Sequence, residues 1–532
     1  MLIVARTLKR FLVEHWQRSL LIALLVFVVL NNLIWHLLGG SPLHWDDAVH
    51  LSASLKAHRI LVTAGVPLSQ LLHFTWDYPP FVFWSAIPFY FIFGEGSLAP
   101  TFAMSCFLIV LLLSTYGLGR RLFDENVGLL SAFLVSAFPI VIDFSRQFML
   151  DLPLAAMTTL SLYLLVRSNE FRSTVWSLLL GIVIGCGLLT KWTFPFFLIY
   201  PFLFTGAAVF LEDTRRGSRL RNLALCVLIA SAISLPWYIV HFVSFLISRS
   251  HVLVHSHRSI IESILYYVLA LPEQTSWLLL SAVVVGIALY VRQHKLKHIV
   301  PILSIVGGYV LLTMVILKVP RFAIPLLPPL AVLACAGIVG WVFRHGHLHE
   351  KRVRYLIASC AFVIFQYSAI TYVTRSSQIG RILSTPLLTV PIIPVQGAKK
   401  SSWQLAAILR TIARDSSSHG ESRKSLRVVP DYIFFNWATF EYAAMLNRFP
   451  VTISTIIGFP GRSDFTILKT GELGEDVAKR QRITDTIIAD TLGYEFLRSF
   501  PLPDGSSAIL LRARVGTGQL GGRIQPKASV HS

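Results

Sequence analysis

The chain has 532 residues, 54% of them hydrophobic and only 14% charged, which excludes an ordinary soluble globular protein and predicts a polytopic membrane protein. The formal net charge of +20 does not indicate nucleic-acid binding, because Lys and Arg cluster in short loops between apolar runs, as in the positive-inside pattern. All five cysteines fall inside apolar runs, so neither a disulfide framework nor a cysteine-based metal site is predicted.

Apolar runs recur from residue 19 to residue 373, at or near the roughly 17 to 25 residues that a membrane-crossing helix needs. The first run follows a basic N-terminus and lacks a clear small-residue cleavage site, so we expect it to be a span and not a cleaved leader. The predicted spans are residues 19–38, 97–118, 127–142, 152–166, 174–190, 193–211, 221–240, 277–291, 299–317, 322–343 and 356–373.

Five basic loops separate these spans, and the positive-inside rule assigns them to the cytoplasm together with the N-terminus. They are residues 120–121, 167–172, 215–221, 292–297 and 344–354. The first long loop, residues 39–80, and everything after residue 374 are then extracytoplasmic. The apolar stretch 81–93 has 13 residues, about 20 Å as a helix. We expect it to be a re-entrant or membrane-edge helix; a short buried crossing is the alternative.

The character of the chain changes at about residue 395, where charged residues return after Pro391 and Pro394. We therefore predict a transmembrane domain over residues 1–375, a small soluble α/β domain over residues 395–515, and a disordered polar tail over residues 516–532. Strands are predicted at 427–429, 451–455, 484–488, 495–500 and 507–512, and helices around 401–413, 436–447 and 472–481.

Charged side chains gather at the predicted outer ends of the spans, which otherwise carry almost no charge. They are Asp46, Asp47, Arg146, Asp151, Lys191 and Arg321. Carboxylates at a membrane edge are candidates for chemistry. The simpler interpretation is that the aspartates cap helices and the basic residues anchor span ends at the interface.

This mixture of acidic and basic groups suits a glycosyl transfer reaction. Transfer of a sugar from a polyprenyl phosphate needs no strong general acid, because the phosphate leaving group is already a weak base. One carboxylate can act as a general base that deprotonates the attacking hydroxyl. Arg and Lys would hold the phosphate, and the spans would offer an apolar groove to the prenyl tail.

An ordered set of short motifs resembles the bacterial protein mannosyltransferase and aminoarabinose-transferase group of GT-C integral-membrane glycosyltransferases. The set covers about residues 20 to 345: the pair Asp46-Asp47 after the first span, Asp77-Tyr78-Pro79-Pro80, Gly119-Arg120-Arg121-Leu122-Phe123, Ser145-Arg146, Leu150-Asp151, Leu189-Thr190-Lys191, and Arg321-Phe322 before Pro325-Leu326-Leu327-Pro328-Pro329. The resemblance implies a bundle of about 11 to 13 transmembrane helices and an outer C-terminal domain. It also implies transfer of a sugar, with inversion, from an undecaprenyl- or dolichyl-phosphate donor to a lipid, glycan or protein acceptor.

The resemblance also implies roles for individual residues. Asp46 matches the first residue of the family's Asp-Glu pair and is the preferred general base, while Asp47 stands in the place of the Glu. Asp151 matches a second family Asp, which we expect to support the acceptor or the base. The donor phosphate is expected to bind Lys191, Arg321 and Arg146, and the substrate to contact His50 and Tyr78.

Histidines are frequent in the predicted outer loops, but they do not form a convincing metal site. The spacing of His255 and His257 lacks a carboxylate or cysteine partner. We expect no cofactor, and a divalent metal is only a weak alternative. The basic stretch from His251 to Tyr267 suits a helix at the membrane surface that covers the donor site.

A transporter or lipid flippase of glycolipids is the main competing hypothesis, since it too would be polytopic and apolar. Proton- or ion-coupled transporters place ionisable residues in mid-span. Here His36 is the only such ionisable residue within the predicted spans, and the charged residues collect at one edge of the membrane. A silent scaffold protein is disfavoured by the same set of edge charges.

Overall fold

The computed structural model describes residues 16–40, 42–75, 78–211, 216–253, 259–294, 298–344, 349–372, 403–415, 424–454 and 463–514. Contacts divide the chain into two compact units. The helical unit comprises Met1–Ser41 and Ala53–Lys400, and the C-terminal unit comprises Pro42–Ser52 and Ser401–Ser532. The predicted tail after residue 515 lies outside the described residues.

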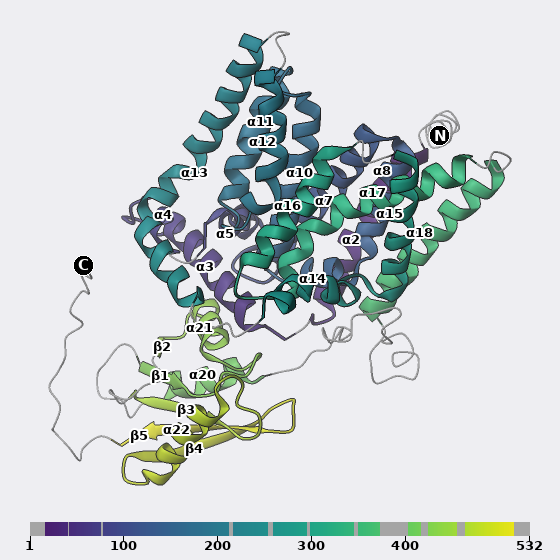
Figure 1. Cartoon of the computed structure of the whole chain (residues 1–532). Coiled ribbons are helices and arrows are strands. Elements are labelled where there is room, and N and C mark those ends of the chain that lie inside the picture. The colour runs from purple at the N-terminus through teal and green to yellow at the C-terminus, as the bar shows by residue number, and fades with distance from the viewer. Residues whose placement is uncertain are drawn as a thin grey trace, which may run out of the picture. The chain divides into compact units, whose positions relative to one another are not determined.

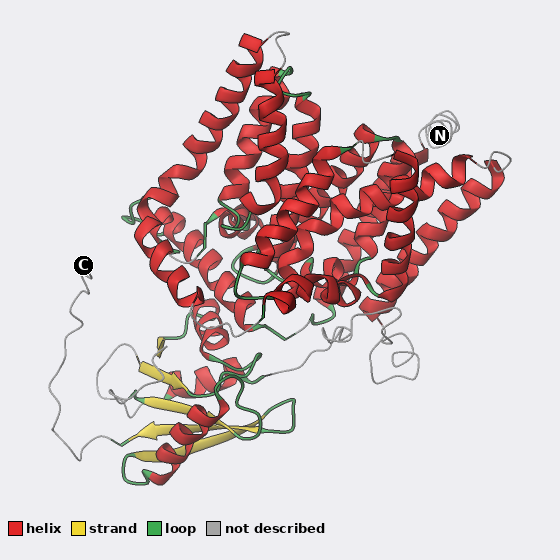
Figure 2. Cartoon of the chain, in the orientation of Figure 1, coloured by secondary structure: helices red, strands yellow, loops and turns green. Residues whose placement is uncertain are grey.

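The helical unit is built almost entirely from helices (Figures 1 and 2). In chain order they are α2 (Trp16–Leu37), α3 (Trp45–Val62), α4 (Gln70–His73), α5 (Phe81–Ser85), α6 (Ile87–Phe93), α7 (Leu98–Leu122), α8 (Glu125–Ala137), α9 (Pro139–Phe144), α10 (Asp151–Ser168), α11 (Thr174–Leu188), α12 (Pro195–Leu211), α13 (Arg216–Leu253), α14 (Ile260–Thr275), α15 (Trp277–His294), α16 (Ile299–Met314), the 3-10 helix η1 (Pro320–Leu326), α17 (Leu327–Arg344) and α18 (His349–Tyr372).

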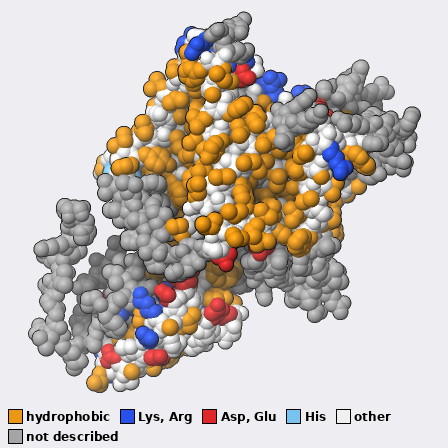
Figure 3. Space-filling view, in the orientation of Figure 1, with side chains coloured by type: hydrophobic (Ala, Val, Ile, Leu, Met, Phe, Trp, Pro, Cys, Tyr) orange, Lys and Arg blue, Asp and Glu red, His pale blue; other side chains and the backbone are white. Residues whose placement is uncertain are grey.

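Hydrophobic side chains cover most of the visible face of this unit (Figure 3), as expected for an integral membrane protein. Four helical segments of the described chain are long and apolar enough to cross a membrane alone: Trp16–Leu37, Leu98–Leu122, Arg216–Phe242 and Pro320–Val342. The pair α14 and α15 would make a fifth span, bent by 119°. Every predicted span coincides with helix, but many of these helices are shorter than the predicted spans.

Proline explains several of the interruptions. Pro139 begins a new helix directly after α8, so the predicted span 127–142 is two short helices. The stretch 81–93 is likewise divided into α5 and α6, with Pro88 in the first turn of α6. Pro320 and Pro325 lie in the 3-10 helix η1, which leads into α17. The proline-rich motifs therefore mark irregular backbone at helix ends.

Helix α10 lies at the centre of the helical unit. It packs against α7, α11 and η1, and almost every side chain along it is buried. Helices α15 and α17 pack tightly together, as do α11 and α13. The N-terminal end of α10 is consequently surrounded by protein, which determines the environment of Asp151, its first residue.

The C-terminal unit is an α/β sandwich around a five-stranded mixed sheet with the strand order β2-β1-β3-β5-β4. The strands are β1 (Lys424–Val428), β2 (Val451–Ser454), β3 (Phe465–Lys469), β4 (Tyr494–Pro501) and β5 (Ser507–Ala513). Strands β1, β2 and β3 are parallel, and β5 pairs antiparallel with both β3 and β4.

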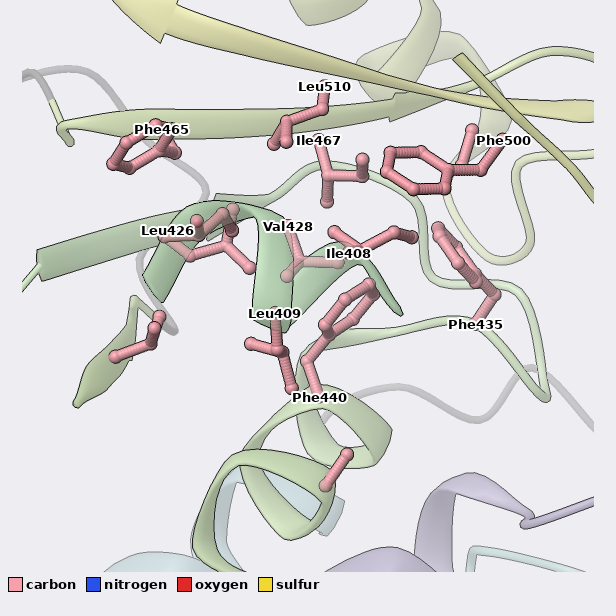
Figure 4. Packing of buried hydrophobic residues seen from close by; sticks show 14 of the residues in the cluster. Ile408, Leu409, Leu426, Val428, Phe435, Phe440, Phe465, Ile467, Phe500 and Leu510 are labelled. Atoms are coloured by element: carbon pink, nitrogen blue, oxygen red, sulfur yellow. The ribbon is translucent and has the colours of Figure 1, made fainter. Parts of the chain in front are cut away.

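Helices cover both faces of this sheet. Helices α20 (Leu405–Arg414) and α21 (Trp437–Leu446) pack on one face, where Ile408, Leu409 and Phe440 meet Leu426 and Ile467 (Figure 4). Helix α22 (Val477–Ala489) covers the other face with a second, smaller apolar cluster. Alternate residues of the central strands serve the two clusters, as the period of a strand requires.

Two predictions for this unit are wrong. Residues 484–488 belong to helix α22 and not to a strand; the buried positions Arg480, Ile483, Thr484 and Ile487 follow the helical spacing i, i+3, i+4, i+7. The sequence reasoning also missed β3, whose five residues are all buried. A fully buried central strand lacks the polar and apolar alternation of a half-exposed strand.

Residues 42–52 pack with the C-terminal unit although they precede it by some 350 residues of sequence. The His44 ring lies edge-on to Phe434 at a centroid distance of 5.0 Å, and Trp45 lies edge-on to Trp437 at 5.9 Å. Such aromatic pairs add to the stabilisation from apolar burial. The start of α3, which carries the acidic pair, is thus part of the C-terminal unit.

Gly474 gives a stability test of this unit. Its φ is +89°, and a Cβ added there would lie 2.0 Å from the Asp431 carbonyl oxygen. Gly505 has a similar φ of +82° but nothing within 4 Å of an added Cβ. We expect Gly505→Ala to lower the free energy of unfolding by about 1–2 kcal/mol through backbone strain alone. Gly474→Ala should cost clearly more, as measured by thermal unfolding; equal losses would contradict this steric explanation.

Candidate functional site

A buried ion pair lies at the start of α10. The Lys191 Nζ donates a hydrogen bond of 2.7 Å to Asp151 Oδ1, and the two side chains are only 4% and 2% exposed. Lys191 therefore does not snorkel to an interface, which excludes the simple anchoring interpretation for this residue. Two charges in such a place persist only because they neutralise one another.

Arg321 extends this pair into a three-membered cluster. Its Nε lies 3.5 Å from Asp151 Oδ2, and its side chain is 27% exposed. The Lys191 ammonium also lies 4.5 Å from the centroid of the Phe322 ring, a cation–π contact. With all three groups ionised, the Asp151–Lys191–Arg321 cluster carries a net charge of +1, which favours a bound anion.

Helix ends and short turns hold the cluster in place. Asp151 is in the first turn of α10, Lys191 follows α11, and Arg321 is in η1. The segment before Lys191 is fixed by hydrogen bonds from the Phe81 amide to the Leu189 carbonyl (3.0 Å) and from Thr190 Oγ1 to the Cys186 carbonyl (2.9 Å).

The 3-10 helix η1 is held from the side of α14. Gln274 Nε2 donates to the Pro320 carbonyl at 2.8 Å, and the Tyr266 hydroxyl donates to the Lys318 carbonyl at 3.2 Å. Lys318 itself is buried and donates to the Leu312 and Thr313 carbonyls at the end of α16. The position of Arg321 thus depends on backbone contacts from two neighbouring helices.

Arg146 contacts residues of helices α2 and α18. Its guanidinium donates to Asn32 Oδ1 (3.1 Å) and to the Thr371 hydroxyl, and it lies over the rings of Trp35 and Tyr367 at 5.0 and 5.3 Å. The Tyr367 hydroxyl donates to the same Asn32 oxygen at 2.6 Å. These contacts connect α2 and α18, and a role of Arg146 in binding the donor phosphate stays a prediction.

The acidic pair lies in the first turn of α3, where Asp46 and Asp47 are both half-buried. The unpaired amides at a helix N-terminus stabilise negative charge. Consecutive residues on a helix point about 100° apart, so the two carboxylates face different directions. One substrate hydroxyl can therefore meet only one of them in good geometry.

The other end of α3 is fastened within the helical unit. Arg59 donates to both carboxylate oxygens of Glu95, at 3.1 Å from Nε and 2.7 Å from the terminal nitrogen. His58 Nδ1 is 3.6 Å from the same carboxylate, and Ser54 Oγ donates to the Phe83 carbonyl at 2.8 Å. Burial lowers the pKa of His58, although Glu95 acts in the opposite direction. This end of α3 is rigidly held.

The two predicted substrate contacts are less clearly placed. His50 is buried one turn after the acidic pair, on the part of α3 that belongs to the C-terminal unit. Tyr78 is half-buried in the segment before α5. Their roles as substrate contacts stay predictions.

The predicted surface helix from His251 to Tyr267 is not continuous. Helix α13 ends at Leu253, and a capping box of Ser259 and Glu262 starts α14 at Ile260. His255 and His257 lie outside the described residues. Within the described ranges, no three His, Cys, Asp or Glu side chains are grouped so that they could hold a metal ion.

Two polar residues that organise this region were missed by the sequence reasoning. Asn32 is a polar residue inside an apolar span, and Glu95 is a lone carboxylate between two apolar stretches. Buried polar groups in a membrane protein need partners, so both positions carried a signal. Their partners, Arg146 and Arg59, are distant in sequence, which is why the pairings could not be predicted.

An apolar helical body followed by a small α/β unit is an ArnT-like GT-C fold. Residues 77–240 match the family described as dolichyl-phosphate-mannose-protein mannosyltransferase. This part of the chain contains Asp151 and Lys191. The predicted resemblance is thereby confirmed, and a comparison with curated protein sequences gives no match.

Solved structures agree with this assignment of the fold. ArnT from Cupriavidus metallidurans bound to undecaprenyl phosphate aligns with a TM-score of 0.56 and 14% identity, over 92% of this chain and 97% of that chain. The apo state of the same protein gives 0.55 and 15% over the same shares. The archaeal oligosaccharyltransferase AglB from Archaeoglobus fulgidus, in complex with an inhibitory peptide and a dolichol-phosphate, gives 0.49 and 12% over 83% and 64%. At such identities, the ArnT structures show a shared fold.

The buried ion pair predicts a specific pattern of stabilities. Asp151→Asn leaves the Lys191 ammonium buried without its counter-charge and should lower the free energy of unfolding by about 3–5 kcal/mol. The double variant Asp151→Asn/Lys191→Met removes both charges and should recover at least half of that loss. The measurement is reversible unfolding in bicelles.

Arg120 supplies the control for this experiment. Its Nε lies 3.2 Å from Glu125, but the side chains are 46% and 32% exposed. Arg120→Gln should therefore change the free energy of unfolding by at most about 1 kcal/mol. An Asp151→Asn loss no larger than that of Arg120→Gln would show that burial does not strengthen the pairing.

Proposed function

We propose that this protein is a glycosyltransferase that moves a sugar from a polyprenyl-phosphate donor to an acceptor hydroxyl at the outer membrane face, with inversion. The acceptor is a lipid, a glycan or a protein. In the proposed topology the N-terminus is cytoplasmic, and the acidic pair and the C-terminal unit are extracytoplasmic. The sugar is a hexose or a pentose, and no metal or other cofactor is part of the proposal.

The Asp151–Lys191–Arg321 cluster is the observation that carries this proposal. It provides a fixed positive site at the end of a buried helix, next to apolar surface, in a fold shared with ArnT. The solved ArnT structure is bound to undecaprenyl phosphate. A lipid phosphate needs both a cationic partner for its head and an apolar groove for its tail.

The proposed chemistry uses one carboxylate as a base. The acceptor hydroxyl gives its proton to the carboxylate while its oxygen attacks the anomeric carbon from the face opposite the phosphate. The bond between the anomeric carbon and the phosphate oxygen breaks, and polyprenyl phosphate leaves with the bonding electrons. Lys191 and Arg321 stabilise the charge that develops on this leaving group.

The surroundings of the aspartates support a choice among them for the base. Asp151 accepts a short hydrogen bond from Lys191 and faces Arg321, so its lone pairs and charge are already committed. Its proposed role is to position the two cations. Asp46 and Asp47 are half-buried in the first turn of α3 and remain the candidates for the proton transfer, with Asp46 preferred.

Single substitutions in the acidic pair test the base. Asp46→Asn removes the proton acceptor with little change in shape and should lower sugar transfer by about 10²–10⁴-fold. Asp47→Asn should have a smaller effect, because the neighbouring carboxylate points about 100° away. The measurement is transfer in membranes at matched expression. Full activity in Asp46→Asn would make Asp47 the base, and full activity in the double variant would end this mechanism.

A donor panel tests the function itself. The purified protein in nanodiscs is incubated with polyprenyl phosphates that carry different hexoses and pentoses, and consumption of each donor is followed by mass spectrometry. Consumption of one donor class is expected, and Lys191→Met should abolish it. If no donor is consumed while glycolipid moves between leaflets, the protein is a transporter or flippase and not a transferase.

A further inference from the structure

The C-terminal unit contains a pocket that has no part in the proposed transfer reaction. Its volume is about 340 Å³, and it lies between helix α20 and the end of strand β4. Helix α20 contributes Arg410, Thr411 and Arg414, and β4 contributes Arg498, Ser499 and Phe500. The lining thus combines two segments that are distant in sequence, so its arginines are not merely the exposed face of one helix.

The charge of this pocket is strongly one-sided. Three arginines line it, and no lining residue is an Asp or a Glu. Within the part of the chain that the structure describes, none of these three arginines has an ion-pair partner. Other arginines of the same unit differ: Arg480 pairs with Asp431 at 2.7 Å, and Arg512 pairs with two carboxylates.

The sequence spacing brings the arginines together. Arg410 and Arg414 are four residues apart on α20 and lie on neighbouring turns of one face. Arg498 follows an irregularity in the pairing of β4 with β5, between Phe496 and Arg498. Its guanidinium lies 5.2 Å from the ring centroid of Phe500, which keeps the charge over a buried ring.

We propose that this pocket binds a small phosphate-bearing ligand, of the size of a sugar phosphate. Arginine is the side chain best suited to bidentate binding of phosphate, and three of them would offset the charge of a phosphomonoester. The Ser499 hydroxyl adds a neutral donor for a further oxygen atom, whereas the Thr411 hydroxyl already donates to the Ala407 carbonyl at 3.0 Å. A volume of about 340 Å³ is at the small end of ligand pockets, which fits a phosphate with one sugar ring and not a polymer.

Arginine protection in the full-length protein tests this proposal. The protein is placed in phosphatidylcholine nanodiscs and treated with phenylglyoxal, and the modification of each arginine is followed by mass spectrometry. Glucose 1-phosphate is the soluble probe, inorganic phosphate is the minimal probe, and glucose is the uncharged control. We expect glucose 1-phosphate to slow modification of Arg410 and Arg498 by about tenfold, since charged hydrogen bonds are worth that much.

Variants measure the same site by calorimetry. Arg410→Gln/Arg498→Gln should weaken binding of glucose 1-phosphate by at least roughly tenfold. Lys479→Gln/Arg482→Gln is the matched control: both residues are exposed on α22, on the other face of the sheet, and their substitution also removes two positive charges. All four positions are exposed, and unchanged thermal unfolding would confirm that the variants are folded.

The outcomes separate the sources of the phosphate. Protection by glucose 1-phosphate or inorganic phosphate supports the site with a soluble ligand. Protection only in nanodiscs that also contain phosphatidic acid supports the same site with a lipid headgroup. Equal protection of Arg482, equal protection by glucose, or no protection by any probe overturns the proposal. Sugar transfer is not measured, so these results do not depend on the outcome of the donor panel.

Discussion

The cost of placing charge in an apolar body is the constraint on which this structure depends. An isolated ammonium or carboxylate inside the helical unit would be strongly destabilising, and the side chains of Lys191 and Asp151 are almost completely buried. Each is tolerated because it neutralises the other, while Arg321 brings a second cation to the edge of the pair. The surplus positive charge is therefore held at a fixed point by helices α10 and α11 and by η1.

The same constraint explains why η1 is irregular and yet well fixed. A proline-containing 3-10 segment leaves backbone carbonyls without helical partners, and in a membrane these groups need donors. Gln274 and Tyr266 from α14 supply two such donors, to the carbonyls of Pro320 and Lys318. Satisfying the backbone thus also positions the side chain of Arg321.

Helix α3 connects the acidic pair to both compact units. Its first two turns pack within the C-terminal unit, through contacts of His44 and Trp45 with Phe434 and Trp437, while its last turns are held by Glu95. Asp46 and Arg59 are 13 positions apart, about 20 Å along a helix.

The sequence predicted those parts of the fold that depend on local pattern. Apolar runs located the helices, and the return of charge near residue 395 located the α/β sheet with four of its five strands. The prediction failed at β3, where burial on both faces removed the alternation of polar and apolar residues. It also failed at α22, where β-branched residues lie on a helix. At the site, Asp151, Lys191 and Arg321 were expected on one edge, and the structure brings them into contact.

Arg146 shows the limit of such predictions. A basic residue at a span end has the same sequence signature whether it binds a phosphate or joins helices, and only its partners decide. Those partners, Asn32 on α2 and Thr371 on α18, are more than a hundred positions away on either side. The pairing itself leaves no local signal in the sequence, because each partner alone resembles an ordinary polar residue in an apolar run.

The proposed division of roles among the aspartates rests on their environments. A carboxylate that is fixed by two cations is a good positioning group, because each ion pair restricts its orientation. A half-buried carboxylate in the first turn of a helix lies in different surroundings. Asp151 has the first environment, and Asp46 and Asp47 have the second. Two kinds of carboxylate in different surroundings are what a transfer reaction with one base and an anionic leaving group requires.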